Sequence, residues 1–145
     1  MSIPKPVFSW PLRVYYEDTD LSGVVYHANY LKFFERARTE WLRSLGCSQE
    51  RLREEIQVVF TVSRIDVAFR SPARLDDELE STVVVTELKR ASLVLTQTLH
   101  RRGDAGRVLA TAEVRVASVD AARFKPTALP PVFRDHAAVI GNDNR

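Results

Sequence analysis

The chain has 145 residues, 45% of them hydrophobic and 28% charged, and a formal net charge of +2. These proportions predict one soluble globular domain, and no apolar run is long enough to insert into a membrane. The 17 arginines form no basic stripe with interleaved aromatic residues, which argues against nucleic-acid binding. Cys47 is the only cysteine, which excludes an internal disulfide and favours the cytoplasm. The N-terminal residues, broken by Pro4 and Pro6, lack the apolar stretch of a secretory signal.

Sequence periodicity predicts a strand followed by one long helix in the first third of the chain. Alternating polarity from Leu12 to Tyr16 predicts a half-buried first strand. From residue 28 to residue 45, apolar residues recur every three or four positions, as on the buried face of a helix. Gly46 is placed to end this helix, and Ser48 is placed to cap a short exposed helix that extends to Glu55.

The following part of the chain is patterned as strands. Apolar alternation over residues 60–69 changes phase near Ser63 and Arg64, which predicts a β-bulge. After a loop over residues 71–78, three antiparallel strands with short connections are predicted at 79–89, 92–102 and 107–119. His100 is expected to face solvent, and His136 lies in a C-terminal stretch whose last residues are expected to be mobile.

Two runs at the centre of the predicted sheet, Val83–Val85 and Leu93–Leu95, are apolar at every position. Side chains alternate between the two faces of a strand, so both faces of the sheet centre are expected to be covered. One long helix covers one face. A partner subunit is therefore expected to cover some of the remaining apolar surface.

An acidic turn, Glu17–Asp20, lies before the predicted long helix. A carboxylate beside a helix N-terminus meets two needs of acyl transfer: a base or nucleophile, and backbone N–H donors for the oxygen that gains charge. Asp18 and Asp20 also fit a simpler role, in which they shape the turn and complement the helix dipole. The nearby His27 and Asn29 exceed what a simple turn requires, and local chemistry alone leaves both interpretations open.

Other hydrolytic and metal chemistries lack the residues that they need. Residues from Asp18 to Gly23 match the first positions of a calcium-binding EF-hand loop, but Asn29 stands where that loop needs a bidentate glutamate. There is no Gly-x-Ser-x-Gly motif, and the three histidines lie far apart in sequence. Cys47 follows a helix end, where the dipole opposes thiolate formation. No cluster shows metal-ligand spacing, so a carboxylate is the best candidate for acyl hydrolysis.

The acidic turn and the start of the helix resemble a known enzyme family. Residues 15–40 resemble the Tol-Pal-associated acyl-CoA thioesterases, in the 4-hydroxybenzoyl-CoA thioesterase-like branch of the hotdog fold. Residues 71–79 and 125–130 are also similar to that family, and the likeness runs from about Trp10 to Pro131. It implies an α+β hotdog fold, in which an antiparallel sheet wraps around one long central helix. The implied single domain has its core at about 10–131.

The resemblance also implies roles for individual residues. Asp20 matches the family's catalytic carboxylate, as nucleophile or general base, whereas Asp18 matches no established chemical role. The backbone N–H at His27 is expected to polarise the thioester carbonyl, and the imidazole to orient substrate or water. Leu21 stands where many relatives have a small residue, so it bears on acyl chain length. The residues expected to contact the substrate are Tyr16, Gly23, Val25, Tyr26 and Asn29.

The implied reaction is the hydrolysis of an acyl-CoA thioester to a carboxylic acid and CoA, with no metal or redox cofactor. The resemblance further implies a homotetramer built as a dimer of dimers, and a link to cell-envelope maintenance or phospholipid metabolism. Two alternatives remain. One is a non-catalytic hotdog protein that binds acyl groups or acyl-CoA, and the other is a hotdog dehydratase, whose histidine-plus-acid site on the helix is not evident here.

Overall fold

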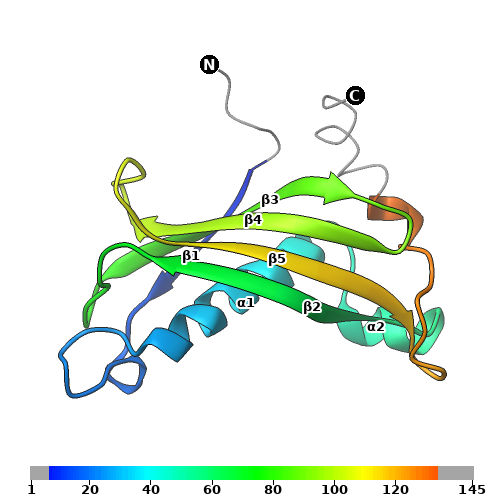
Figure 1. The fold of residues 1–145 in the computed structure, drawn as a ribbon, viewed down its shortest axis with the longest axis horizontal. Coiled ribbons are helices and arrows are strands. Elements are labelled where there is room, and N and C mark those ends of the chain that lie inside the picture. Colours follow the sequence, from blue (N-terminus) through cyan, green and yellow to red (C-terminus); the bar gives the residue numbers. More distant parts are fainter. Residues whose placement is uncertain (1–6, 134–145) are drawn as a thin grey trace.

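One antiparallel sheet lies against a long helix in the computed structural model, which describes residues 7–133 (Figure 1). The helices are α1 (His27–Ser44) and α2 (Gln49–Glu55), and a short 3-10 helix, η1, covers Tyr16–Asp18. The strands are β1 (Phe8–Arg13), β2 (Val58–Phe69), β3 (Glu78–Leu88), β4 (Ser92–Arg101) and β5 (Val108–Asp120). Their order in the sheet is β1-β3-β4-β5-β2, and every pairing is antiparallel. This arrangement is the predicted hotdog fold.

Helix α1 forms the core with one apolar face and ends where the sequence predicts. Phe33, Phe34 and Ala37 are completely buried on this face, and burying each phenylalanine contributes about 1.5–3 kcal/mol. Gly46 adopts a left-handed φ of +82°, and its N–H donates to the Arg43 carbonyl at 2.9 Å. Glycine adopts this conformation without the steric cost of a Cβ, so Gly46 ends the helix cleanly.

The short helix and the bulge are also confirmed. The Ser48 hydroxyl accepts a hydrogen bond from the Arg51 N–H at 3.2 Å, as an N-cap of α2 does. In β2, the pairing register with β5 shifts between Val62 and Arg64, where the phase of the apolar alternation changes. The three strands β3, β4 and β5 form the predicted meander.

The predicted position of the first strand is wrong. Strand β1 ends at Arg13, and Tyr16 begins η1 with 82% of its surface exposed. The chain leaves the sheet because Val14 bonds to the loop before β3. The Val14 N–H donates to the Asp77 carbonyl at 2.9 Å, and the Val14 carbonyl accepts from the Asp76 N–H at 3.0 Å. The next N–H, that of Tyr15, donates to the Asp18 carboxylate instead of to a neighbouring strand.

The sheet has two unlike edges. Strand β1 is six residues long and contains Pro11, which has no N–H to offer a further strand. Strand β2 is 12 residues long and contains no proline. Two large side chains of β2 remain exposed, Val62 at 45% and Phe69 at 52%.

The face of the sheet opposite α1 carries paired threonines around its central valines. Thr82 and Thr98 share a hydroxyl hydrogen bond of 2.7 Å, and on the same face Val84 is half-buried. The expected cover by a partner subunit on this face stays a prediction. His100, expected to face solvent, is instead only 6% exposed, and its Nε2 lies 3.0 Å from Glu80 Oε1. The Glu80 side chain, opposite it on β3, is one of the groups that shield the ring.

The chain after β5 folds back onto the core. The Leu129 N–H donates to the Arg90 carbonyl at 2.8 Å, and Phe133 is 1% exposed against Trp41 and Phe60. The expectation of a mobile end and the placement of His136 lie outside the described residues. Among residues 7–133, no helix has the length and apolar character needed to cross a membrane.

Candidate functional site

A cleft of about 270 Å³ opens at the N-terminus of α1. Its aromatic wall is formed by Phe69 at the end of β2, with its ring centroid 5.2 Å from Tyr30 and 6.4 Å from His27. Both of the latter residues belong to the first turn of α1. The lining residues are Val24, Val25, His27, Tyr30, Phe69, Arg70, Ser71 and Pro72. The cleft therefore brings together the helix N-terminus, the segment before it and the loop after β2.

Asp18 holds the acidic turn against the start of α1. This residue is only 3% exposed, and its carboxylate accepts hydrogen bonds from the Tyr15 N–H at 2.8 Å and the Asn29 side-chain amide at 2.9 Å. Its backbone carbonyl accepts from the Tyr26 N–H at 2.8 Å. Buried polar groups are stable only when they are paired in this way. Asp18 and Asn29 therefore have a structural role, because the hydrogen bond between their side chains joins the turn to α1.

Asp20, two residues further on, is exposed. Its Oδ1 accepts hydrogen bonds from the Ser22 hydroxyl and from the Ser22 N–H, the latter at 2.8 Å. These two bonds lower the pKa of Asp20 against a small opposing effect of desolvation, and the nearby His27 lowers it further. Within residues 7–133, Oδ2 has no hydrogen-bond partner. Asp20 thus offers an ionised oxygen with free lone pairs at neutral pH.

The N-terminus of α1 presents free backbone donors beside this carboxylate. The first helical residue is His27, and no side chain within residues 7–133 caps the helix. Among the described residues, the backbone N–H groups of His27 and Ala28 have no acceptor, as expected for the first turn of a helix. Such N–H groups, together with the helix dipole, favour a negatively charged oxygen. The cleft therefore has the donors needed to stabilise an oxyanion.

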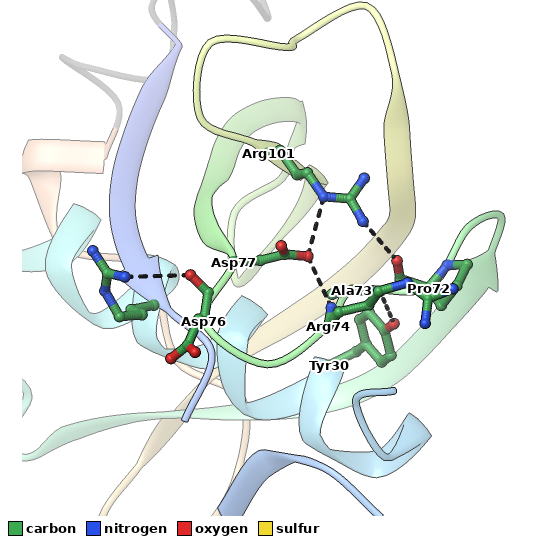
Figure 2. Close-up of polar contacts among 8 residues, drawn as sticks. Tyr30, Pro72, Ala73, Arg74, Asp76, Asp77 and Arg101 are labelled. Carbon is green, nitrogen blue, oxygen red and sulfur yellow. Dashed lines mark hydrogen bonds and ion pairs between the residues drawn. The ribbon is translucent and has the colours of Figure 1, made fainter. Parts of the chain in front are cut away.

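The loop between β2 and β3 forms one wall of the cleft and is fixed by polar contacts (Figure 2). The Ala73 N–H donates to the Tyr30 hydroxyl at 3.0 Å, which ties the loop to α1. Asp77 Oδ2 accepts from the Arg74 N–H at 2.8 Å and from Arg101 Nε at 3.1 Å. Arg101 also donates to the Pro72 carbonyl at 3.1 Å. A rigid wall of this kind keeps the spacing between the cleft residues constant.

The structure separates the residues predicted for the site into three groups. Val25 and His27 line the cleft, and Asp20 lies close enough to His27 for their charges to interact. Asn29 is buried against Asp18. The other predicted contact residues, which are exposed and do not line the cleft in this chain, are Tyr16, Gly23 and Tyr26.

Sequence reasoning did not assign Tyr30 and Phe69 to the site. Tyr30 carries the periodicity of a core residue, and its hydroxyl reaches a loop 43 residues away in sequence. Phe69 lies at the end of a strand whose alternation gives no functional signal. The likeness of residues 71–79 to the thioesterase family was the one available signal that this side of the cleft matters.

The single cysteine is a poor nucleophile in this fold. Cys47 is 8% exposed, and burial raises the pKa of its thiol. A buried neutral thiol does not supply the thiolate that attacks a carbonyl.

Replacing Ser22 by alanine is expected to move the acid limb of any Asp20-dependent activity to higher pH. The Ser22 hydroxyl is the largest contributor to the lowered pKa of Asp20, so its removal raises that pKa toward the ordinary value. The wild-type limb should lie at a lower pH than that at which an ordinary aspartate titrates, because its lowered pKa keeps the carboxylate ionised in more acidic solution. Profiles of kcat/KM against pH, taken where circular dichroism shows a folded protein, test this. Ser63→Ala, in β2, is the control, and identical limbs in all three proteins would contradict the assignment.

The fold and the position of the cleft define a hotdog domain. The chain belongs to the thioesterase-like superfamily, whose sequence profile matches residues 14–136. It is 49% identical over 124 residues to the acyl-CoA thioester hydrolase YbgC of Escherichia coli O157:H7, covering 86% of this chain and 90% of the relative. The acyl-CoA thioesterase YbgC of Haemophilus influenzae is also 49% identical, over 123 residues, covering 85% of this chain and 88% of the relative.

A solved structure agrees with this membership. The crystal structure of a probable thioesterase from Bartonella henselae superimposes with a TM-score of 0.80 at 34% sequence identity. The match covers 86% of this chain and 100% of that chain.

Proposed function

We propose that this protein hydrolyses acyl-CoA thioesters to carboxylic acids and free CoA. The observation that carries the proposal is the exposed, ionised Asp20 near the start of α1, where the first backbone N–H groups have no acceptor among the described residues. The membership of the thioesterase-like superfamily and the names of the YbgC relatives support the same reaction. Arg70 lines the cleft and makes no ion pair among the described residues, and a guanidinium in this position suits a phosphate of CoA.

In the reaction, the thioester carbonyl lies against the N–H groups of His27 and Ala28. These donors stabilise the negative charge that develops on the carbonyl oxygen, a contribution of about 3–4 kcal/mol for a preorganised donor. Two routes lead from there. In the first, Asp20 attacks the carbonyl carbon and CoA leaves as the thiolate, which gives a mixed anhydride that water then hydrolyses. In the second, Asp20 removes a proton from water, and the hydroxide formed attacks the carbonyl carbon and displaces the thiolate.

The substrate-contact roles of Val25, Tyr26, Tyr16 and Gly23 are part of this proposal. Val25 lines the cleft directly, whereas the other three lie outside it in this chain. Exposed side chains such as those of Tyr16 and Tyr26 suit the rim of a substrate site, because the apolar ring can contact the ligand while the hydroxyl contacts water. Asn29 acts through the bond to Asp18.

The protein is proposed to act as a homo-oligomer, a homotetramer built as a dimer of dimers. The long edge of β2, which pairs with no further strand among the described residues and exposes Val62 and Phe69, supports pairing with a second copy. Light scattering in solution tests the state, and a monomer mass at micromolar concentration would remove this part of the proposal.

A cytoplasmic location and an association with the Tol-Pal system are also proposed, on the family resemblance of residues 15–40. Two observations in cells test them. A fusion to a reporter that is active only after export should stay inactive, and deletion of the gene should weaken the cell envelope. An active reporter would contradict the location, and an intact envelope would contradict the association.

A panel of acyl-CoA substrates tests the activity. Short-chain, long-chain and aromatic acyl-CoAs are each mixed with the protein, and release of free thiol is followed with a thiol reagent. We expect turnover of at least one class, and a lower KM for acyl-CoA than for the matching acyl-pantetheine, which lacks the nucleotide phosphates. Binding without measurable turnover across the whole panel would favour the non-catalytic alternative.

A further inference from the structure

A second cavity, of about 200 Å³, lies at the other half of α1. It is bounded by α1, the first part of β2, the central strands and Phe133. Most of its lining is apolar and includes Trp41, Phe60 and Leu95. Of the described residues, two charged ones line it, Glu35 and Arg38. It shares no lining residue with the cleft, and it is centred about 12 residues along α1 from His27, which corresponds to about 18 Å.

A buried glutamine fixes the position of Arg38. Gln97 on β4 is completely buried, and its side-chain NH₂ donates to the Phe34 carbonyl at 3.0 Å and the Thr82 carbonyl at 3.2 Å. These two bonds occupy both donors of the amide, so its oxygen must face away from them. That oxygen, Oε1, accepts from Arg38 Nη1 at 3.0 Å. The guanidinium is therefore held at the cavity by a rigid acceptor in the core.

Arg38 keeps most of its hydrogen-bonding capacity unused. A guanidinium has five N–H donors, and within residues 7–133 Gln97 is its one hydrogen-bond partner. No carboxylate of the described residues forms an ion pair with it. Burial lowers the pKa of Arg38, and the charge of the nearby Glu35 opposes this effect. Glu35 is itself exposed and is bonded by the Thr39 hydroxyl at 3.2 Å, so solvent screens it.

We propose that this cavity binds a free carboxylic acid with an apolar body, whose carboxylate is held by Arg38. The planar fork of a guanidinium matches a carboxylate with two parallel hydrogen bonds. The aromatic and aliphatic lining accepts an apolar body, and a small number of polar groups in such a pocket sets orientation. An acid of this class satisfies both the unused donors and the apolar wall, whereas a fully apolar ligand leaves the guanidinium unpaired.

The binding site is independent of the thioester cleft. The ligand class includes the acid that the proposed hydrolysis releases, but the inference rests on the contacts of Arg38 and needs no turnover. Binding is therefore measured on protein without acyl-CoA, and Asp20→Asn is expected to bind the acid as the parent does. Failure of the proposed hydrolysis and failure of acid binding are then separate results.

Trp41 supplies the signal for the test because it lines the cavity. Trp10 on β1 is the other tryptophan of the chain, so Trp10→Phe leaves Trp41 as the single reporter. Hexanoate and benzoate are titrated into this protein, and hexanamide and benzamide serve as neutral ligands with the same bodies. We expect saturable changes in Trp41 emission, with each acid bound about 10- to 100-fold more tightly than its amide.

Arg38→Met is the test variant, and Arg36→Met is its control. Arg36 is exposed on the same helix, and its Cζ lies 5.9 Å from the centroid of the Phe33 ring. Neither Arg36 nor Phe33 lines the cavity. Arg38→Met should weaken acid binding about 10- to 100-fold and leave the amides unchanged, and Arg36→Met should change neither. Equal affinity for acid and amide in the parent, no saturable signal, or full acid binding by folded Arg38→Met would each overturn the proposal. The comparison of acid with amide needs only the Trp10→Phe protein, so it tests the proposal even if Arg38→Met fails to fold.

Discussion

Replacing Asp20 by asparagine is expected to reduce thioester hydrolysis at least 100-fold and to leave the free energy of unfolding nearly unchanged. The asparagine side chain has the same shape but neither attacks a carbonyl nor removes a proton from water, and general-base catalysis alone accounts for about 100- to 10,000-fold. Stability is spared because Asp20 is exposed and its partners belong to its own turn. Steady-state kinetics and chemical denaturation measure the two quantities on the same protein.

Asp120 provides a matched control for this substitution. Its carboxylate also accepts two hydrogen bonds from the turn that follows it, from the Ala122 N–H at 2.8 Å and the Arg123 N–H at 3.0 Å. These bonds likewise lower the pKa of Asp120, but the residue pairs with Val58, at the end of β2 opposite the cleft. Asp120→Asn should keep wild-type turnover. Wild-type turnover in Asp20→Asn would remove Asp20 from the mechanism.

Single-turnover hydrolysis in ¹⁸O-labelled water separates the two routes for Asp20. If Asp20 attacks the carbonyl carbon, water that hydrolyses the anhydride at the aspartyl carbon leaves the label in the protein. If Asp20 acts on water, the label enters only the released acid. Label found in the Asp20 peptide therefore identifies the nucleophilic route.

Replacing Asp18 by alanine is expected, unlike Asp20→Asn, to lower the free energy of unfolding by about 2–4 kcal/mol. The change leaves the Tyr15 N–H and the Asn29 amide without their acceptor, and an unsatisfied buried polar group costs about 1–3 kcal/mol. Turnover should also fall, because the turn that carries Asp20 is then no longer fixed to α1. Urea denaturation measures the loss.

Glu17→Ala is the control for Asp18, since Glu17 is exposed in the same 3-10 turn. It should change the free energy of unfolding by less than about 0.5 kcal/mol. An Asp18→Ala protein as stable as the parent would mean that the buried hydrogen bonds do not hold the turn. The proposed difference in role between the two aspartates would then lose its physical basis.

Local sequence signals predicted those features of the fold that depend on neighbouring residues. Gly46 ends α1 because the required φ favours glycine, and Ser48 caps α2 because its hydroxyl reaches a nearby N–H. The bulge near Arg64 follows from a change of side-chain parity within one strand. Each of these signals is complete within a few positions of the sequence.

Features that depend on distant partners were beyond sequence reasoning. The alternation from Leu12 to Tyr16 continues past the true end of β1, because the bonds that draw the chain away come from the loop before β3. His100 appears polar and exposed in sequence, yet it is buried beside Glu80 on the adjacent strand. The partnership of Arg38 with Gln97 spans 59 residues and has no local signal.

The candidate site was predicted only in part. Asp18 and Asp20 are equivalent carboxylates in a sequence, and the family resemblance alone favoured Asp20. Burial separates them physically: both Asp18 oxygens accept hydrogen bonds, from Tyr15 and Asn29, whereas one Asp20 oxygen has no partner among the described residues. The catalytic role of Asp20 remains a proposal for the kinetics described above to test.

The unlike edges of the sheet limit how copies of this chain can assemble. A sheet with two open edges can add strands from further copies at both ends and grow into a fibre. Here Pro11 removes an N–H from the β1 edge, while the β2 edge is long and free of proline. If β2 pairs with β2 of a second copy, the contact uses the same surface on both chains and leaves no open β2 edge for a third. Growth by this edge therefore stops at two, and the same strand that permits association also protects the protein from polymerising.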